Sequence, residues 1–212
     1  ERGHRVTLFD RAGEIGGQLN MAKQVPGKEE FWGFVDWYRT MVSEAGITLE
    51  LGRDVSAADL SGYDEVIIAT GVIPRDPAIP GQDRPEVLSY IDVLRHTAEV
   101  GKRVAVIGAG GIGCDVAEFL THEGKSSGED LDTFLNEWGV DREHTSRGGV
   151  LKPTTGAPPR EVTLCQRREG KRGAGVGKTT GWIHRTSLKH RQGEMRDNVQ
   201  YVRVDDAGLH IT

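Results

Sequence analysis

Apolar and polar residues follow strand and helix periods in the first third of the chain. Residues 4–9 alternate in polarity, which predicts a strand ending at Asp10. Residues 29–45 carry apolar side chains three and four positions apart, which predicts a helix whose stripe packs into a core. The stripe consists of Phe31, Phe34, Val35, Tyr38, Met41, Val42 and Ala45. Residues 47–51 alternate again, and the continuous apolar run 66–69 is typical of a buried strand in a parallel sheet.

The remaining two thirds repeat this strand and helix order around one long interruption. Residues 102–107 form an apolar run that enters a glycine-rich turn at 108–113, and 114–120 show helical spacing. The next strand pattern comes only at 161–166, so 124–160 are interpreted as a loop-rich insertion. Within it, one or two helical turns are expected to cover an apolar surface, formed by Leu131, Phe134, Leu135 and Trp138. Strands that alternate with helices predict an α/β fold with parallel sheets.

Composition narrows the class of protein. Charged residues make up 28% of the chain and apolar residues 36%, and no apolar run reaches the length of a membrane span, so no membrane partner is expected. The formal net charge of −5 argues against nucleic acid as a partner. Cys114 and Cys165 are too few for a disulfide framework and are expected to be small core residues. No secretory signal opens the chain, so a reducing cytoplasm is the expected compartment.

The turn at 108–113 has the G-x-G-x-x-G spacing of a dinucleotide-binding fingerprint, set between a strand and a helix. Gly108 is expected to permit the tight turn, Gly110 to let the backbone approach a pyrophosphate, and Gly113 to let the helix pack on the strand. The free N–H groups of the helix start, at Gly111 and Ile112, face the phosphates. A glycine-rich loop without a ligand is the less favoured interpretation.

The choice of coenzyme depends on the end of the second strand. Counting from the fingerprint points to Asp130 and Asp132 as ribose ligands, but no strand precedes them. The strand at 161–166 is followed instead by Arg167 and Arg168, whose guanidinium groups suit a 2′-phosphate. This pattern favours NADPH, and the alternative left open is that both arginines are solvated loop charges.

The first third of the chain resembles the FAD-binding half of a flavoprotein with two dinucleotide-binding domains. The matching features are the acidic strand end, the paired glycines at 16–17 and an Ala-Thr-Gly run followed by proline. The resemblance assigns to the FAD site Asp10, Arg11, Gly17, Gln18, Ala69, Thr70 and Gly71. The glycine fingerprint that should precede such a strand end by about 20 residues is expected before residue 1, so the FAD unit is expected to be incomplete.

Nearly the whole chain resembles bacterial NADPH-dependent 2,4-dienoyl-CoA reductases, which are iron–sulfur flavoproteins of the old yellow enzyme type. The most specific blocks are Asn136-Glu137-Trp138-Gly139 and 177–185, together with 15–18, 22–24, 26–31 and 87–90. The resemblance implies an internal part of the C-terminal FAD and NADPH region. FMN, a 4Fe–4S cluster and the acyl-CoA substrate site would then belong to an N-terminal barrel outside this chain.

Two Rossmann-like units are therefore predicted, a partial FAD-binding domain at 1–75 and an NADPH-binding domain at 76–212. Their step would be hydride delivery from NADPH to FAD, with no catalytic side chain and no metal site expected among these residues. The alternatives are the same module of an amine dehydrogenase or enoate reductase, or a nucleotide-binding fragment that is inactive alone. The Gly-Lys-Thr-Thr run at 177–180 is not interpreted as a P-loop, because Arg172 stands where its first glycine belongs.

Overall fold

The computed structural model describes residues 2–171, 173, 175–177 and 179–212. The chain forms two compact units, of which the first contains Glu1–Asn20 and Glu30–Pro77 and the second contains Met21–Glu29 and Ala78–Thr212. The predicted division after residue 75 placed Met21–Glu29 in the first half, whereas its contacts group it with the second unit. Lys178, part of the run that resembles a P-loop, lies outside the described residues.

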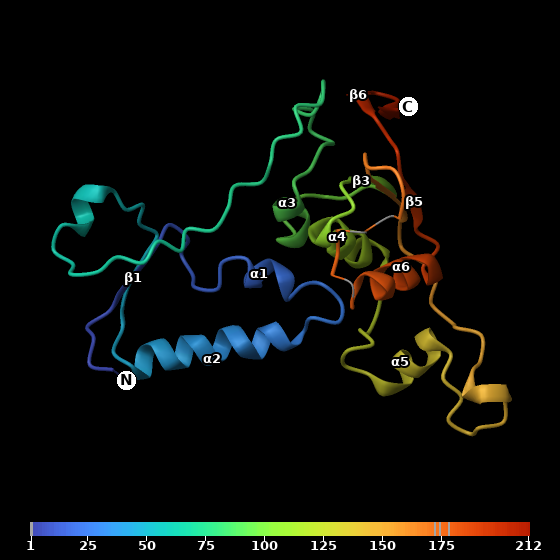
Figure 1. Ribbon diagram of the computed structural model, residues 1–212, viewed down its shortest axis with the longest axis horizontal. Helices are drawn as coiled ribbons and strands as arrows, with labels where there is room; N and C mark the ends of the chain where they lie inside the picture. Colours follow the sequence, from blue (N-terminus) through green and yellow to red (C-terminus); the bar gives the residue numbers. More distant parts are fainter. Residues whose placement is uncertain (1, 172, 174, 178) are drawn as a thin grey trace. The chain divides into compact units, whose positions relative to one another are not determined.

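The first unit contains a parallel pair of strands and one long helix (Figure 1). Strand β1 (Thr7–Asp10) pairs in parallel with β2 (Thr48–Leu51), with Thr7 opposite Thr48. Helix α2 (Glu30–Glu44) connects them, and Gly46 follows it with a φ of +64°, a conformation that favours glycine after a helix. The predictions for residues 4–9, 29–45 and 47–51 are thereby confirmed. The unit also contains the 3₁₀ turn η1 (Ala57–Leu60), and the short helix α1 (Leu19–Ala22) spans the point at which the chain passes to the second unit.

Two predictions for this unit are wrong. Residues 66–69 form no strand, and the side chains of Ile67 and Ile68 are 92% and 81% exposed. A strand needs a neighbour for its backbone N–H and C=O groups, and no described strand pairs with this run. The α2 stripe is also only partly core: Val35 and Val42 are buried, whereas Phe34 and Tyr38 are both 43% exposed. The apolar stripe of α2 is therefore covered only at some of its positions.

The second unit is built on the parallel sheet β3-β4-β5. Its strands are β3 (Arg103–Ile107), β4 (Glu161–Cys165) and β5 (Glu194–Arg196), and its main helices are α3 (Tyr90–Leu94), α4 (Gly111–Thr121) and α6 (Gly181–His190). Helix α4 packs against β4, α3 and α6. The hairpin β6 (Tyr201–Asp205) and β7 (Gly208–Ile211) ends the chain. Strand β4 lies where the sequence predicted it, directly beside β3, despite the long insertion between them.

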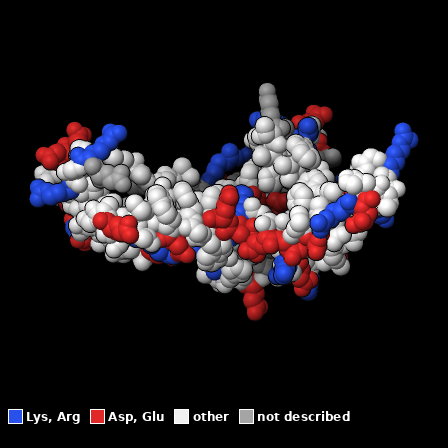
Figure 2. All heavy atoms as spheres, turned by 90° about the horizontal axis from the view of Figure 1, so that it is seen from below, with Lys and Arg blue, Asp and Glu red and all other residues white. Residues whose placement is uncertain are grey.

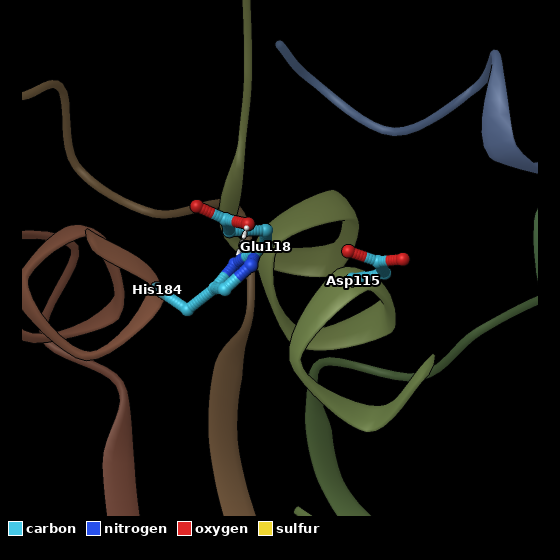
Figure 3. A group of neighbouring side chains, drawn as sticks. All are labelled: Asp115, Glu118 and His184. Atoms are coloured by element: carbon cyan, nitrogen blue, oxygen red, sulfur yellow. Dashed lines mark hydrogen bonds and ion pairs between the residues drawn. The ribbon is translucent and has the colours of Figure 1, made fainter. Parts of the chain in front are cut away.

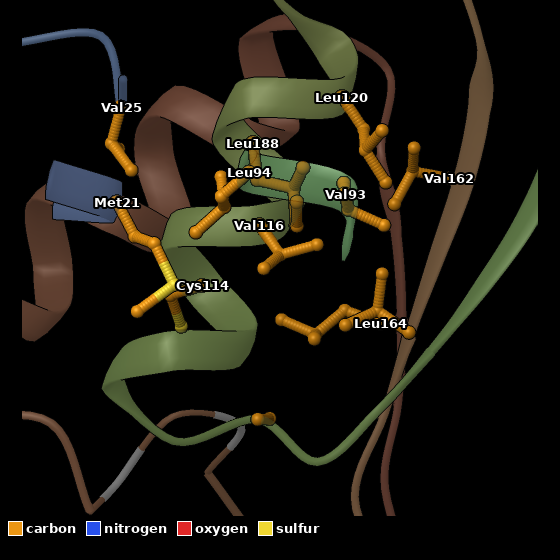
Figure 4. Packing of buried hydrophobic residues seen from close by; sticks show 13 residues of the cluster. Met21, Val25, Val93, Leu94, Cys114, Val116, Leu120, Val162, Leu164 and Leu188 are labelled. Carbon is orange, nitrogen blue, oxygen red and sulfur yellow. The ribbon is translucent and has the colours of Figure 1, made fainter. Parts of the chain in front are cut away.

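The core of this unit lies between α4 and the sheet (Figure 4). Leu120 from α4 and Leu164 from β4 are each 1% exposed, and Met21 and Val25 reach the same cluster from the segment Met21–Glu29. Cys114, which lies in the cluster, and Cys165 are both buried and unbridged, as predicted. Burial raises the pKa of the Cys114 thiol to about 11, so the sulfur stays protonated and packs as an apolar group.

The insertion at 124–160 contains a helix, α5 (Leu131–Trp138). Asp130 caps its first turn, since the Asp130 Oδ1 atom accepts the N–H of Thr133 at 2.8 Å. This capping role agrees with the rejection of Asp130 as a ribose ligand. The ring of Trp138 contacts that of Trp182 on α6 with centroids 5.8 Å apart. Leu131 and Phe134 are 61% and 42% exposed, so only part of the predicted apolar set covers the second unit.

The surface carries charges of both signs. On the face shown in Figure 2, lysine and arginine side chains stand in separate groups among acidic ones, without a continuous basic field. Among the described helices, none is both long and apolar enough to cross a lipid bilayer.

Candidate nucleotide-binding site

The turn between β3 and α4 places the predicted fingerprint at the carboxyl-terminal edge of the sheet. Gly108 has a φ of +102°, which side-chain-bearing residues rarely adopt, and its N–H donates to the carbonyl oxygen of Cys165 at 2.8 Å. Gly110 is the N-cap residue of α4, and its carbonyl oxygen accepts the N–H of Cys114 at 3.0 Å. The chain therefore leaves β3, turns at once and starts a helix beside the end of β4.

Gly113 and Gly110 differ in the space that their surroundings would leave for a side chain. A Cβ on Gly113 would overlap the carbonyl oxygen of Gly108, so only glycine allows α4 to start this close to the turn. A Cβ on Gly110 would meet no protein atom within 4 Å. Gly110 thus borders open space in which a pyrophosphate can approach the backbone, which fits a bound dinucleotide.

The start of α4 offers hydrogen-bond donors to that space. Gly111 and Ile112 form its first turn, and both are exposed, Ile112 by 51%. The first N–H groups of a helix have no partner within the helix, and its dipole is positive at this end. These properties are those of an anion-binding helix start. The assignment of both residues to a phosphate site remains a prediction.

Arg167 and Arg168 follow β4 at the same edge of the sheet. Ile107 pairs with Cys165, so both arginines lie just beyond the strand end that adjoins Gly108. Both side chains are exposed, and no acidic partner holds either guanidinium group among the described residues. Two cations near the fingerprint, in the position where NAD-binding proteins place an acid, are compatible with a 2′-phosphate.

Two residues that the sequence analysis missed fix this edge. The Gln166 Nε2 atom donates to the carbonyl oxygen of Arg168 at 2.8 Å, and its Oε1 atom accepts the N–H of Gly173 at 3.1 Å. The hydroxyl of Tyr201 donates to the carbonyl oxygen of Cys165 at 3.0 Å. A glutamine after a strand and a tyrosine from a distant hairpin carry no sequence signal for this role, because the contacts exist only after folding.

A cluster of charged side chains lies along α4. Lys28 Nζ binds Asp115 Oδ2 at 2.6 Å. His184 Nδ1 binds Glu118 Oε2 at 2.9 Å, and Figure 3 shows this pair together with Asp115. The hydrogen bond to Glu118 raises the pKa of His184, which favours the imidazolium form. Asp115, Glu118 and His184 offer ligand atoms within 4.8 Å of one another, but each carboxylate already has a cationic partner. These pairs join α4 to the segment Met21–Glu29 and to α6.

In the first unit, the turn after β1 has a backbone conformation that would let a bound molecule come close to the main chain. The Asp10 Oδ1 atom accepts the N–H of Ala12 at 2.9 Å, which holds the carboxylate at the strand end. Gly16 and Gly17 have φ values of +114° and +49°, so this turn requires glycine-like conformations. The Asn20 Nδ2 atom donates to the carbonyl oxygen of Ile15 at 2.9 Å, while its buried Oδ1 atom has no donor among the described residues.

The other predicted FAD residues are exposed. Arg11 and Gln18 flank this turn on the surface of the first unit. The run Ala69, Thr70 and Gly71 belongs to no sheet, and Gly71 has a φ of +74°. Their assignment to an FAD site therefore remains a prediction that the fold of the first unit does not test.

A parallel sheet with a glycine turn at the start of its central helix defines a dinucleotide-binding protein. The chain belongs to the pyridine nucleotide-disulphide oxidoreductase family, whose model matches residues 1–208. This family membership confirms the predicted α/β dinucleotide-binding fold with parallel sheets. The chain thus has the fold of an oxidoreductase module that binds a flavin and a pyridine nucleotide.

Relatives with known names are much longer than this chain. A cinnamate reductase of Clostridium sporogenes is 37% identical over 131 residues, which are 58% of this chain and 19% of the relative. An NADH oxidase of Thermoanaerobacter brockii is 32% identical over 161 residues, which are 73% of this chain and 24% of the relative. The structure of a 2-naphthoyl-CoA reductase superposes with a TM-score of 0.75 at 22% identity, over 100% of this chain and 27% of that one, which shows the shared fold.

Proposed function

We propose that this chain is the FAD- and NADPH-binding part of a reductase of the 2,4-dienoyl-CoA reductase type. Its task is to bind NADPH at the β3–α4 turn and to present the coenzyme to FAD. The observation that carries the choice of coenzyme is the pair Arg167 and Arg168 at the end of β4, beside the fingerprint. FMN, a 4Fe–4S cluster and the acyl-CoA site are assigned to parts of the protein outside these 212 residues.

The electrostatics of the β3–α4 turn support nucleotide binding. The start of α4 supplies N–H groups and a positive dipole end for the pyrophosphate, and Gly110 leaves the approach open. Arg167 and Arg168 supply charge-assisted donors for a third phosphate group, with Gln166 holding the backbone of Arg168. When bound, NADPH and FAD supply the hydride chemistry, while these side chains bind and orient the nucleotide.

The substrate class rests on the resemblance of blocks such as Asn136–Gly139 and 177–185 to dienoyl-CoA reductases. The names of a cinnamate reductase and of a naphthoyl-CoA reductase are compatible with reduction of an unsaturated acid or thioester. The name of the Thermoanaerobacter relative, an NADH oxidase, favours the coenzyme without a 2′-phosphate instead. The choice of coenzyme is therefore the part of the proposal to test first.

The test compares adenosine 2′,5′-bisphosphate with AMP, two ligands that differ only by the 2′-phosphate. Isothermal titration of the purified chain should give a dissociation constant about tenfold or more lower for the bisphosphate, as expected for a gained charge-assisted contact. Equal constants, or tighter binding of AMP, would contradict the assignment of NADPH. Titration at two salt concentrations serves as a control, because a phosphate contact weakens as salt increases.

A further inference from the structure

A cavity of about 480 Å³ opens in the second unit at the edge of the sheet opposite the fingerprint. Glu99 and Val100 line it just before β3, and Arg160 lines it directly before β4. Since β3 and β4 are parallel, this is their amino-terminal edge, about 16 Å from the nucleotide edge for strands of five residues. The volume falls within the range of cavities that hold small molecules.

Arg160 brings an unsatisfied donor to this cavity. Its Nε atom is buried and has no hydrogen-bond partner in the described part of the chain. Buried polar groups in folded proteins are nearly always paired, because an unmade hydrogen bond is costly away from water. The described chain thus leaves the guanidinium group of Arg160, a residue that lines the cavity, only partly paired.

The other residues that line the cavity determine the charge and the polarity of the ligand that it can hold. Burial lowers the pKa of His122, so this imidazole is neutral near pH 7 and Arg160 carries the permanent positive charge of the lining. The side chain of Glu99 is exposed. Val93 and Leu120, both labelled in Figure 4, are buried and form an apolar wall of the cavity together with Phe119. The cavity thus combines the cation of Arg160 with an apolar wall on one side and with polar side chains, including Gln24 and His96, on the other.

We propose that this cavity binds a small monocarboxylate with an apolar body. The carboxylate pairs with the guanidinium edge of Arg160, whose donors match the two oxygens of a planar acid. The apolar body lies against Val93, Phe119 and Leu120. Inorganic phosphate is the competing ligand, because Gln24 and His96 also line the cavity and could donate to its further oxygens, and the experiment separates the two. The site shares no residue with the nucleotide edge and does not depend on the proposed function.

The experiment is equilibrium dialysis of the chain against radiolabelled hexanoate. We expect saturable binding at one molecule per chain. In Arg160→Met, binding should weaken about tenfold or more, whereas Arg103→Met, an exposed arginine at the same sheet edge outside the cavity, should leave it unchanged. Phe119→Ala keeps the guanidinium group of Arg160 and removes part of the apolar wall. This variant should weaken the binding of hexanoate but leave the binding of acetate unchanged.

Three results would overturn the proposal. The first is the lack of saturable hexanoate binding to the unmodified chain. The second is equal binding by the Arg160→Met and Arg103→Met variants, which would place the acid elsewhere. The third is displacement of hexanoate by inorganic phosphate at equal concentration, which would show that the apolar wall contributes nothing to the choice of ligand.

Discussion

Replacing both Arg167 and Arg168 with alanine removes the two cations at the end of β4. A hydrogen bond to a charged group contributes about 1.5–3 kcal/mol when it is shielded from water. Both guanidinium groups are exposed, so solvent screening reduces this to about 1 kcal/mol each, or about 2 kcal/mol for the pair. That loss corresponds to a roughly 30-fold increase in the dissociation constant for NADPH. NADH lacks the 2′-phosphate, so its dissociation constant should change by less than about threefold.

Isothermal titration of the variant with NADPH and with NADH measures both constants under the same conditions. Arg103→Ala is the matched control, because it removes an exposed arginine at the other end of the neighbouring strand. It should leave the ratio of the two constants unchanged. If the double variant increases the dissociation constants for NADPH and NADH by the same factor, the arginines do not bind the 2′-phosphate and the reasoning is wrong.

The other predictions concern the fingerprint, pH and flavin. Gly110→Val should reduce NADPH affinity about tenfold or more, because the new side chain fills the open space at the turn, and the melting temperature should stay unchanged. Unchanged NADPH affinity would contradict the assignment of this turn to the pyrophosphate. The bond to Glu118 raises the folded-state pKa of His184, so its stabilising effect is complete at acid pH and is lost as pH rises through that pKa. In denaturant titrations, His184→Gln should therefore cost more stability near about pH 5.5 than near about pH 9, and a pH-independent cost would refute the pairing. The purified chain should hold less than one FAD per chain, because the predicted flavin-binding run Ala69, Thr70 and Gly71 is exposed and belongs to no sheet; visible flavin absorbance at one FAD per chain would disprove this.

The sequence predicted those elements whose pattern is local. Strand β4 was identifiable 48 residues beyond Gly113 because Val162 and Leu164 alternate with polar neighbours and both turn into the core. The fingerprint was identifiable for the same reason, since the need for glycine at 113 arises from atoms only five residues away. Counting alone would have selected Asp130, which the structure shows to cap α5.

Features that depend on distant partners were not predictable. The run at 66–69 has the composition of a strand, but a strand forms only with a neighbour, and no described segment serves as one. The ion pair of Lys28 with Asp115 joins residues far apart in the chain, and no periodicity marks either member. The cavity at Arg160 is assembled from several separate segments, each of which is an ordinary loop or helix end in the sequence.

The segment Met21–Glu29 has a consequence for how the second unit can change during evolution. The chain leaves the first unit at residue 21, returns to it at residue 30 and leaves again after residue 77. Met21 and Val25, 5% and 1% exposed, are thus core residues encoded apart from the rest of their unit. A gene fusion or deletion that carried only Ala78–Thr212 would leave a hole in that core. The second unit is thus discontinuous in sequence, and a continuous stretch that begins at Ala78 lacks two side chains of its own core.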